Sequence, residues 1–212
     1  MVRSVKKIPK LRSRGRENRR KLLREAQRLM LQQPDASSVK FSDVFEAAGV
    51  SRGSAYRIYD GIEDLLQDIA TDWVVNMAAY LRGSRPEIRP ATWAELSNFL
   101  VRRGAEYWVA TEGTLRLLPR LRNASPGSYR LALEAMGLCV GDIFERYFTM
   151  PEIPLWPEKL SFYIQLCDIT FADSMRTEGR VSEQRIVEAE TLMHTYLAFF
   201  LPVDLPKKRQ AS

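Results

Sequence analysis

Residues 47–61, with the sequence AAGVSRGSAYRIYDG, combine three glycines with side chains that can donate hydrogen bonds to phosphates or base edges. A phosphate-binding loop would follow a strand and carry Gly-x-Gly-x-x-Gly, or end in Gly-Lys-Ser/Thr. Gly49, Gly53 and Gly61 are instead four and eight residues apart, with no strand pattern before them. A plain turn between helices would need only Gly49. The donors after it favour a helix-turn-helix that contacts DNA: Ser51, Arg52, Ser54, Tyr56 and Arg57.

The helix-turn-helix interpretation gives each part of this stretch a role. Gly49 stands where the chain must turn sharply, and we expect a positive φ there. Ser51 is placed to cap the second helix, whose N-terminus attracts phosphate. Gly53 costs up to about 1 kcal/mol of helix propensity, but it removes a side chain where a DNA backbone could approach. The buried side of the first helix is expected from Phe41, Val44, Phe45 and Ala48.

The segment AAGVSRGSAYRIYDGIEDLL resembles the signature of the TetR family of bacterial transcriptional regulators, A-G-V-S-(K/R)-G-(T/S)-x-Y-x-(H/Y)-F-x-x-K-(E/D)-(E/D)-L-(L/F). The resemblance in motif covers about residues 18–66. It implies an all-α protein, with an N-terminal three-helix helix-turn-helix DNA-binding domain followed by a larger helical ligand-binding and dimerisation domain. It also implies that Tyr56 touches a phosphate. The whole expected DNA-binding set is Ser42, Ser51, Arg52, Gly53, Ser54, Tyr56, Arg57 and Tyr59.

Two positions depart from the family pattern. Ile62 stands where the family has a lysine that contacts phosphate. Phe45 stands four residues before the turn glycine, where a small residue is usual, so the two helices must pack differently here.

Positive charge is concentrated at one end of the chain. Residues 1–24 hold eleven Lys or Arg and one acid, so this segment carries +10 although the whole chain carries only +6. We expect residues 1–16 to form a basic flexible arm that lies along DNA phosphates or enters the minor groove. A solvated tail that only aids solubility is the alternative.

Apolar residues recur at three- and four-residue spacing through most of the chain, and strand-type alternation is nearly absent, which predicts an all-α fold. We predict a DNA-binding domain over 17–61, a connecting helix over 62–81, a ligand-binding and dimerisation domain over 82–201 and a flexible tail over 202–212. The two prolines of 82–92 make that stretch the best candidate for a domain boundary. The predicted helices cover 18–31, 41–48, 51–59, 62–81, 93–110, 114–121, 126–148, 157–177 and 182–201, with Thr92 and Ser125 as N-caps.

Large apolar side chains gather in the middle helices, where they could line a pocket for a small molecule or simply fill the core. Gln165 and Asp168 are polar residues on an otherwise apolar helix. Either could orient a ligand, or be exposed or satisfied within the protein. The candidate ligand-binding residues are Trp73, Met77, Phe99, Trp108, Met136, Gln165 and Asp168.

The last two predicted helices are apolar nearly all round, which indicates that both of their sides are covered. We expect a homodimer in which these two C-terminal helices and their counterparts form a four-helix bundle, as the resemblance implies. Burial within one subunit is the alternative. A dimer would place two recognition helices about 34 Å apart, the spacing of successive major grooves.

No arrangement of residues in the sequence suggests catalysis or metal binding. His194 is the only histidine, and HExxH does not occur. Residues 49–53 match GxSxG, but no strand pattern precedes them, so they do not form the nucleophile elbow of a hydrolase. Cys139 and Cys167 lie in apolar helical patterns and are expected to be buried, reduced thiols. No apolar run approaches the roughly 20 residues that cross a bilayer, and the basic N-terminus lacks the apolar core of a secretory signal. We therefore predict a cytoplasmic protein that is not an enzyme and has no cofactor, metal or membrane partner.

Taken together, these observations predict a ligand-responsive transcriptional regulator that binds double-stranded DNA. In this interpretation it is a repressor, released from a palindromic operator by an unidentified small molecule. Two alternatives stay open. One is a constitutive architectural DNA-binding protein with a filled core. The other is a membrane or protein scaffold that uses the basic arm alone.

Overall fold

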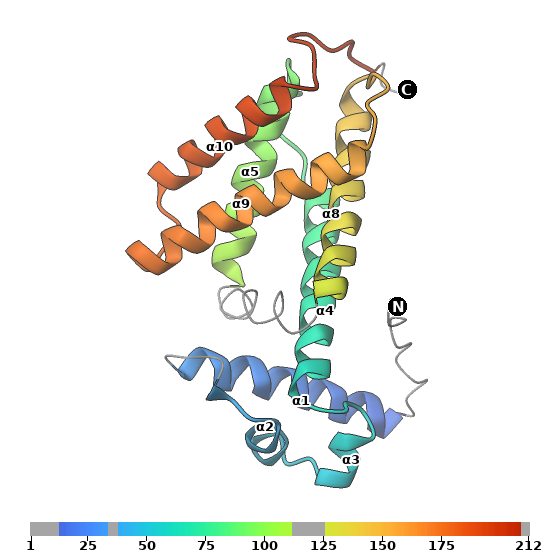
Figure 1. Ribbon diagram of the computed structural model, residues 1–212, viewed down its shortest axis with the longest axis vertical. Helices are drawn as coiled ribbons and strands as arrows, with labels where there is room; N and C mark the ends of the chain where they lie inside the picture. Colours follow the sequence, from blue (N-terminus) through green and yellow to red (C-terminus); the bar gives the residue numbers. More distant parts are fainter. Residues whose placement is uncertain (1–12, 34–37, 112–125, 209–212) are drawn as a thin grey trace. The chain divides into compact units, whose positions relative to one another are not determined.

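The computed structural model describes residues 13–33, 38–111 and 126–208, and for 126–128 the backbone alone. All of the regular elements in these ranges are α-helices (Figure 1), and no β-strand occurs among them beyond one isolated bridge between Phe148 and Lys207. The expected all-α fold is therefore confirmed. The helices are α1 (Ser13–Gln32), α2 (Phe41–Ala47), α3 (Arg52–Tyr56), α4 (Ile62–Gly83), α5 (Trp93–Ala110), α8 (Pro126–Tyr147), α9 (Trp156–Glu178) and α10 (Glu183–Ala198).

Most helix ends agree with the predictions to within a few residues, and the first helix is the main exception. It begins at Ser13 rather than at residue 18, so residues 13–16 are helical and not part of a flexible arm. An i,i+4 ion pair of 3.0 Å between Lys21 and Glu17 supports these early turns. The rest of the predicted arm, the helix over 114–121 and the cap at Ser125 lie outside the described residues.

The chain divides into two compact units. The first contains Met1–Trp73 and Thr111–Arg130, and the second contains Val74–Ala110 and Leu131–Ser212. The division falls inside α4, between Trp73 and Val74. The proline-containing stretch 82–92, where a boundary was predicted, lies within the second unit. Leu81 and Trp93, on either side of that stretch, are both buried, which ties the stretch to one core.

The first unit is built on a core from α1, α2, α3 and the beginning of α4. Gly49 makes the turn between α2 and α3 with φ +62°, which confirms the expected positive φ. Phe45 is accommodated because its ring packs 5.7 Å from Phe41 and 6.2 Å from Tyr56, between ring centroids. The buried apolar residues of this core are Leu22, Ala26, Met30, Val39, Phe41, Val44, Val50, Ala55, Tyr59, Leu65, Leu66 and Ile69.

In the second unit, α10 packs against both α9 and α5, and α5 crosses behind it in Figure 1. Helices α8 and α9 come so close that a Cβ on Gly137 would lie 2.6 Å from the backbone oxygen of Pro157. Cys139 and Cys167 are buried and free, as expected. None of the described helices has the length and apolar character that a membrane-spanning segment needs.

Residues 202–208 are packed rather than free, which corrects the predicted flexible tail as far as the structure describes it. The amide of Thr149 donates to the oxygen of Pro206 at 2.7 Å, and the amide of Lys208 donates to the oxygen of Tyr147 at 2.8 Å. Leu205 is buried, so apolar burial and backbone pairing together hold this segment.

Candidate DNA-contacting surface and ligand cavity

Helix α3 and the residue before it present most of the predicted DNA-binding side chains to solvent. Arg52, Gly53 and Arg57 are exposed, and Tyr56 keeps 46% of its surface accessible. Ser51 is exposed as well, while Ser42 on α2 and Ser54 on α3 are half-buried. The first unit therefore brings seven of the eight predicted residues to its α2–α3 surface.

Ser51 occupies the N-cap position of α3, as expected, but its side chain does not cap the helix. Its hydroxyl donates to the hydroxyl of Ser54 at 2.9 Å, and no backbone amide of α3 donates to it. The first amides of α3 therefore have no side-chain acceptor from Ser51.

Arg52 and Gly53 shape the exposed side of α3. The guanidinium of Arg52 lies 5.7 Å from the ring centroid of Tyr56, close enough for a cation–π contact. A Cβ built on Gly53 would meet no atom of the described residues within 4 Å. Packing within the protein therefore does not demand glycine at this position.

Tyr59 is a correction to the predicted DNA-contacting set, because its side chain is only 4% exposed. Its hydroxyl donates to Oδ2 of Asp68 at 2.5 Å. Burial, followed by this hydrogen bond, raises the pKa of Tyr59 above its ordinary value. The sequence carries one signal of this burial. A tyrosine replaces the usual phenylalanine, and an aspartate follows it nine residues later on an apolar helix face.

Arg19 completes the same buried cluster. Its Nε and Nη2 atoms each donate to a carboxylate oxygen of Asp68 at 2.7 Å, and Nη2 also reaches Asp72 at 3.2 Å. The hydrogen bond with Asp68 is the main cause that raises the pKa of Arg19. One of the eleven cations of residues 1–24 is thus committed to holding α1 against α4.

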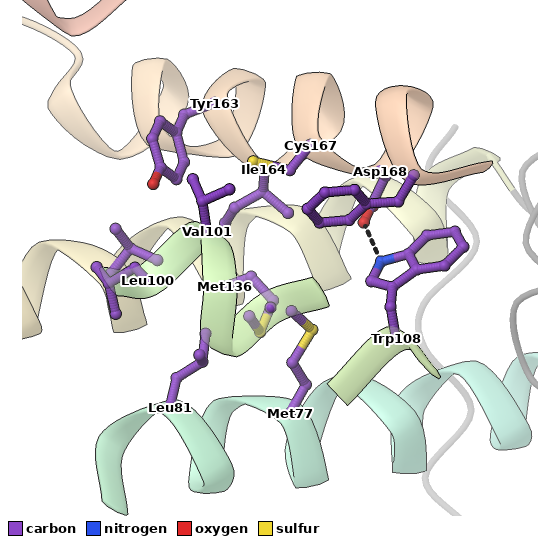
Figure 2. A pocket seen from close by; sticks show the side chains of 13 residues that line it. Met77, Leu81, Leu100, Val101, Trp108, Met136, Tyr163, Ile164, Cys167 and Asp168 are labelled. Atoms are coloured by element: carbon purple, nitrogen blue, oxygen red, sulfur yellow. Dashed lines mark hydrogen bonds between the residues drawn. The ribbon is translucent and has the colours of Figure 1, made fainter. Parts of the chain in front are cut away.

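The second unit contains a cavity of about 30 Å³ (Figure 2). Four of the predicted ligand-binding residues line it, namely Met77, Trp108, Met136 and Asp168. The sequence reasoning missed the other lining residues: Leu81, Leu100, Val101, Gly104, Val140, Tyr163, Ile164, Cys167 and Phe171. None of the lining residues carries a positive charge.

Three predicted ligand-binding residues do not line this cavity. Trp73 belongs to the first unit, where its Nε1 atom donates to the hydroxyl of Thr111 at 2.9 Å. Gln165 donates to the backbone oxygen of Ser161 on its own helix at 3.4 Å. Phe99 is half-buried elsewhere on α5. All three residues are close in sequence to residues that line the cavity, but their side chains project from other sides of their helices.

Asp168 is the acidic residue of the cavity lining. It is 7% exposed, and its Oδ1 atom accepts a hydrogen bond of 3.1 Å from Nε1 of Trp108, drawn as a dashed line in Figure 2. Burial raises the pKa of Asp168 to about 7, although the bond from Trp108 acts in the opposite direction. Burial also raises the pKa of Cys167 and of Tyr163. Near neutral pH, therefore, this carboxyl group is balanced between its charged and neutral forms.

Helices α9 and α10 leave an apolar face exposed. Phe162 and Ile169 on α9, Leu192 on α10 and Phe199 at the C-cap of α10 are exposed, and Phe199 is 79% accessible. The ring of Tyr196 lies 5.4 Å from that of Phe162, between centroids, and joins the two helices into one face. Exposed apolar surfaces of this kind typically mark interaction sites.

No protein-family model matches the sequence, and no curated protein is significantly similar to it. Solved structures are similar in fold. A TetR-family transcriptional regulator from Streptomyces coelicolor aligns over 87% of this chain and 99% of its own, with a TM-score of 0.69 and 15% identity. A TetR transcriptional regulator from Rhodococcus sp. RHA1 aligns over 89% and 98%, with a TM-score of 0.63 and 16% identity. The fatty acid degradation regulator FadR from Bacillus halodurans aligns over 85% and 94%, with a TM-score of 0.58 and 13% identity.

Proposed function

We propose that this chain, which has the fold of TetR-family transcriptional regulators, is itself a DNA-binding transcriptional regulator. The observation that carries the proposal is the exposed surface of α3 and its C-cap, which presents Arg52, Tyr56 and Arg57 together with Gly53. Arginine recognises guanine edges and phosphates through paired hydrogen bonds, and tyrosine donates to phosphate oxygens. Since nothing in the described part of the chain excludes a side chain at Gly53, the close approach of a partner is the best reason for a glycine there.

The apolar face of α9 and α10 supports a homodimer in this proposal. A second copy of the same face would cover Phe162, Ile169, Leu192 and Phe199 across a two-fold axis, and four helices would then form a bundle. Two copies of α3 about 34 Å apart would read two half-sites of a palindromic operator.

The cavity of the second unit is the proposed effector site. Helix α4 supplies Leu65 and Leu66 to the core of the first unit, and Met77 and Leu81 to the cavity. We propose that it is the connecting helix through which an effector changes the spacing of the two DNA-reading helices. In the repressor form of this mechanism, the effector favours a spacing that releases the operator.

Selection of bound sites from random duplex DNA tests the proposed function. The expected result is a consensus with two-fold symmetry. A selection without enrichment contradicts sequence-specific binding.

Two variants sharpen the test. Arg57→Ala removes an exposed cation at the C-cap of α3, so we expect it to weaken binding and to lower the slope of log K against log salt by about 0.9 for one lost phosphate contact. Arg176→Ala, an exposed position on α9, is the matched control and leaves the slope unchanged. Equal slopes for the two variants would remove Arg57 from the DNA-contacting set.

The small size of the cavity favours a second candidate, a constitutive DNA-binding protein without an effector. Ligand pockets usually measure roughly 300–1,000 Å³, and this cavity measures about 30 Å³. That candidate predicts binding with little sequence preference, and no small molecule that changes it.

A further inference from the structure

The cavity of the second unit contains a buried carboxyl group without a counter-charge. The only hydrogen bond that the described structure gives Asp168 comes from the indole of Trp108. Among the described residues, no Lys, Arg or His lines the cavity, so the lining supplies no cation to the ionised carboxylate. A buried carboxylate in apolar surroundings is unfavourable unless it is paired, and a ligand that carries a positive charge would supply the missing partner.

The walls around Asp168 suit an organic cation. The rings of Trp108 and Phe171 lie edge to face with centroids 6.0 Å apart, and Tyr163 adds a third aromatic ring. Aromatic faces attract cations through their quadrupoles, and they also cover the apolar part of a ligand. A carboxylate together with aromatic rings is therefore selective for an ammonium group over an inorganic cation, which oxygen ligands would hold better.

Space for the ligand can come from the two methionines of the wall. Met77 and Met136 both reach the cavity, and unbranched methionine side chains adopt other rotamers at little cost. Gly104 leaves further room, since a Cβ at this position would lie 3.8 Å from Cε of Met77. The volume of about 30 Å³ is thus a lower limit for what the site can hold.

We propose that the effector is a small organic ammonium ion whose charged end pairs with Asp168 and whose apolar body displaces the side chains of Met77 and Met136. This inference rests on the proposed function only in naming the bound molecule the effector. The binding itself needs no DNA.

The pH dependence of binding follows from the groups that face Asp168. Cys167 and Tyr163, both on α9, stay uncharged at neutral pH because burial raises the pKa of each. Helices α4, α5 and α8 contribute no ionisable lining residue, so Asp168 alone titrates there near pH 7. An ammonium ion binds the carboxylate form and releases a proton from the protonated form. Affinity therefore rises about tenfold from pH 6 to pH 8, as the ionised fraction rises.

Three four-carbon probes that differ in charge test the proposal on the full chain without DNA: butylammonium, butan-1-ol and butyrate. The readout is the NMR signal of the Trp108 indole N–H, assigned with the Trp108→Phe variant. We expect butylammonium to bind about tenfold more tightly than butan-1-ol at pH 8, because its hydrogen bond to Asp168 is charge-assisted. Asp168→Asn keeps an acceptor for Trp108 and should abolish this preference and the pH dependence. The same titrations are carried out on Met136→Ala, which enlarges the cavity and so admits the probes if the wild-type cavity is too small.

Three other outcomes of these titrations would overturn the proposal. Equal binding of the ammonium and the alcohol shows that charge is not recognised. Tighter binding of butyrate, strengthening at low pH, shows that the protonated carboxyl group selects an anion. No response to butylammonium in either the wild-type protein or Met136→Ala shows that the site does not open. Failure of the DNA selection with intact ammonium binding refutes the proposed function and leaves this inference standing.

Discussion

Replacing Asp168 by asparagine should stabilise the protein, and increasingly so as the pH rises. The pKa of this carboxyl group is about 7 in the folded protein, against an ordinary value of 3.8. Because the folded pKa is the higher one, the folded protein binds the proton more tightly than the unfolded chain does. Asp168 thus leaves the free energy of unfolding unchanged below about pH 4, and it lowers this free energy by its full amount above about pH 7. A difference of about three pKa units corresponds to about 4 kcal/mol of unfolding free energy.

Urea unfolding of the wild-type protein and Asp168→Asn, at one fixed protomer concentration, measures this cost. We expect the variant to be more stable by about 4 kcal/mol at pH 8 and by about 2 kcal/mol at pH 5. Asp142→Asn is the matched control, because Asp142 is 59% exposed and pairs with Arg82 at 3.3 Å. Its effect should stay below about 1 kcal/mol at both values of pH. If the difference in unfolding free energy between Asp168→Asn and the wild-type protein were the same at pH 5 and pH 8, the raised pKa of Asp168 would be refuted.

Three further substitutions test other parts of the structure. Tyr59→Phe removes the hydroxyl that donates to Asp68, so we expect the free energy of unfolding to fall by about 1 kcal/mol in thermal or urea unfolding. The affinity for DNA should stay unchanged. A loss of DNA affinity at equal stability would return Tyr59 to the DNA-contacting surface. The added methyl group of Gly104→Ala comes no closer than 3.8 Å to a described atom, so this variant should be more stable by up to about 1 kcal/mol. The methyl group of Gly137→Ala would lie 2.6 Å from a backbone atom, so that variant should be less stable by about 1–3 kcal/mol. The reverse order of stability would contradict the close crossing of α8 and α9. Phe199→Glu places a charge on the exposed apolar face and should turn the proposed dimer into a monomer in analytical ultracentrifugation, and an unchanged dimer would place the interface elsewhere.

Features that depend on a few neighbouring residues could be predicted from the sequence. Gly49 has the positive φ that a turn between two helices requires. Thr92 caps α5, since its hydroxyl accepts from the amide of Glu95 at 3.2 Å. Helix α8 begins at Pro126, where a proline at the first helical position loses no hydrogen bond. In each case the physical cause lies within about one turn of the residue.

Features that depend on distant parts of the chain could not be predicted in this way. Tyr59 fits a DNA-reading motif locally, but its hydroxyl is bonded to Asp68, which Arg19 orients from a helix 49 residues away. Gln165 and Asp168 are polar residues on the same helix, and the packing of α5 and α8 decides that only Asp168 reaches the cavity. Gly104 shapes the cavity through an absent side chain, which leaves no signal in an apolar pattern.

The position of the tryptophans gives the protein a built-in optical reporter. No tryptophan precedes Trp73, so α1, α2 and α3 contain none, while Trp93, Trp108 and Trp156 belong to the second unit. Trp108 donates its indole hydrogen to Asp168, so a ligand that engages this carboxyl group should change the fluorescence of that ring directly. DNA bound at α3 touches no tryptophan in our proposal. A change in intrinsic fluorescence on adding operator DNA would then be a label-free signal that the binding event had been transmitted along the chain.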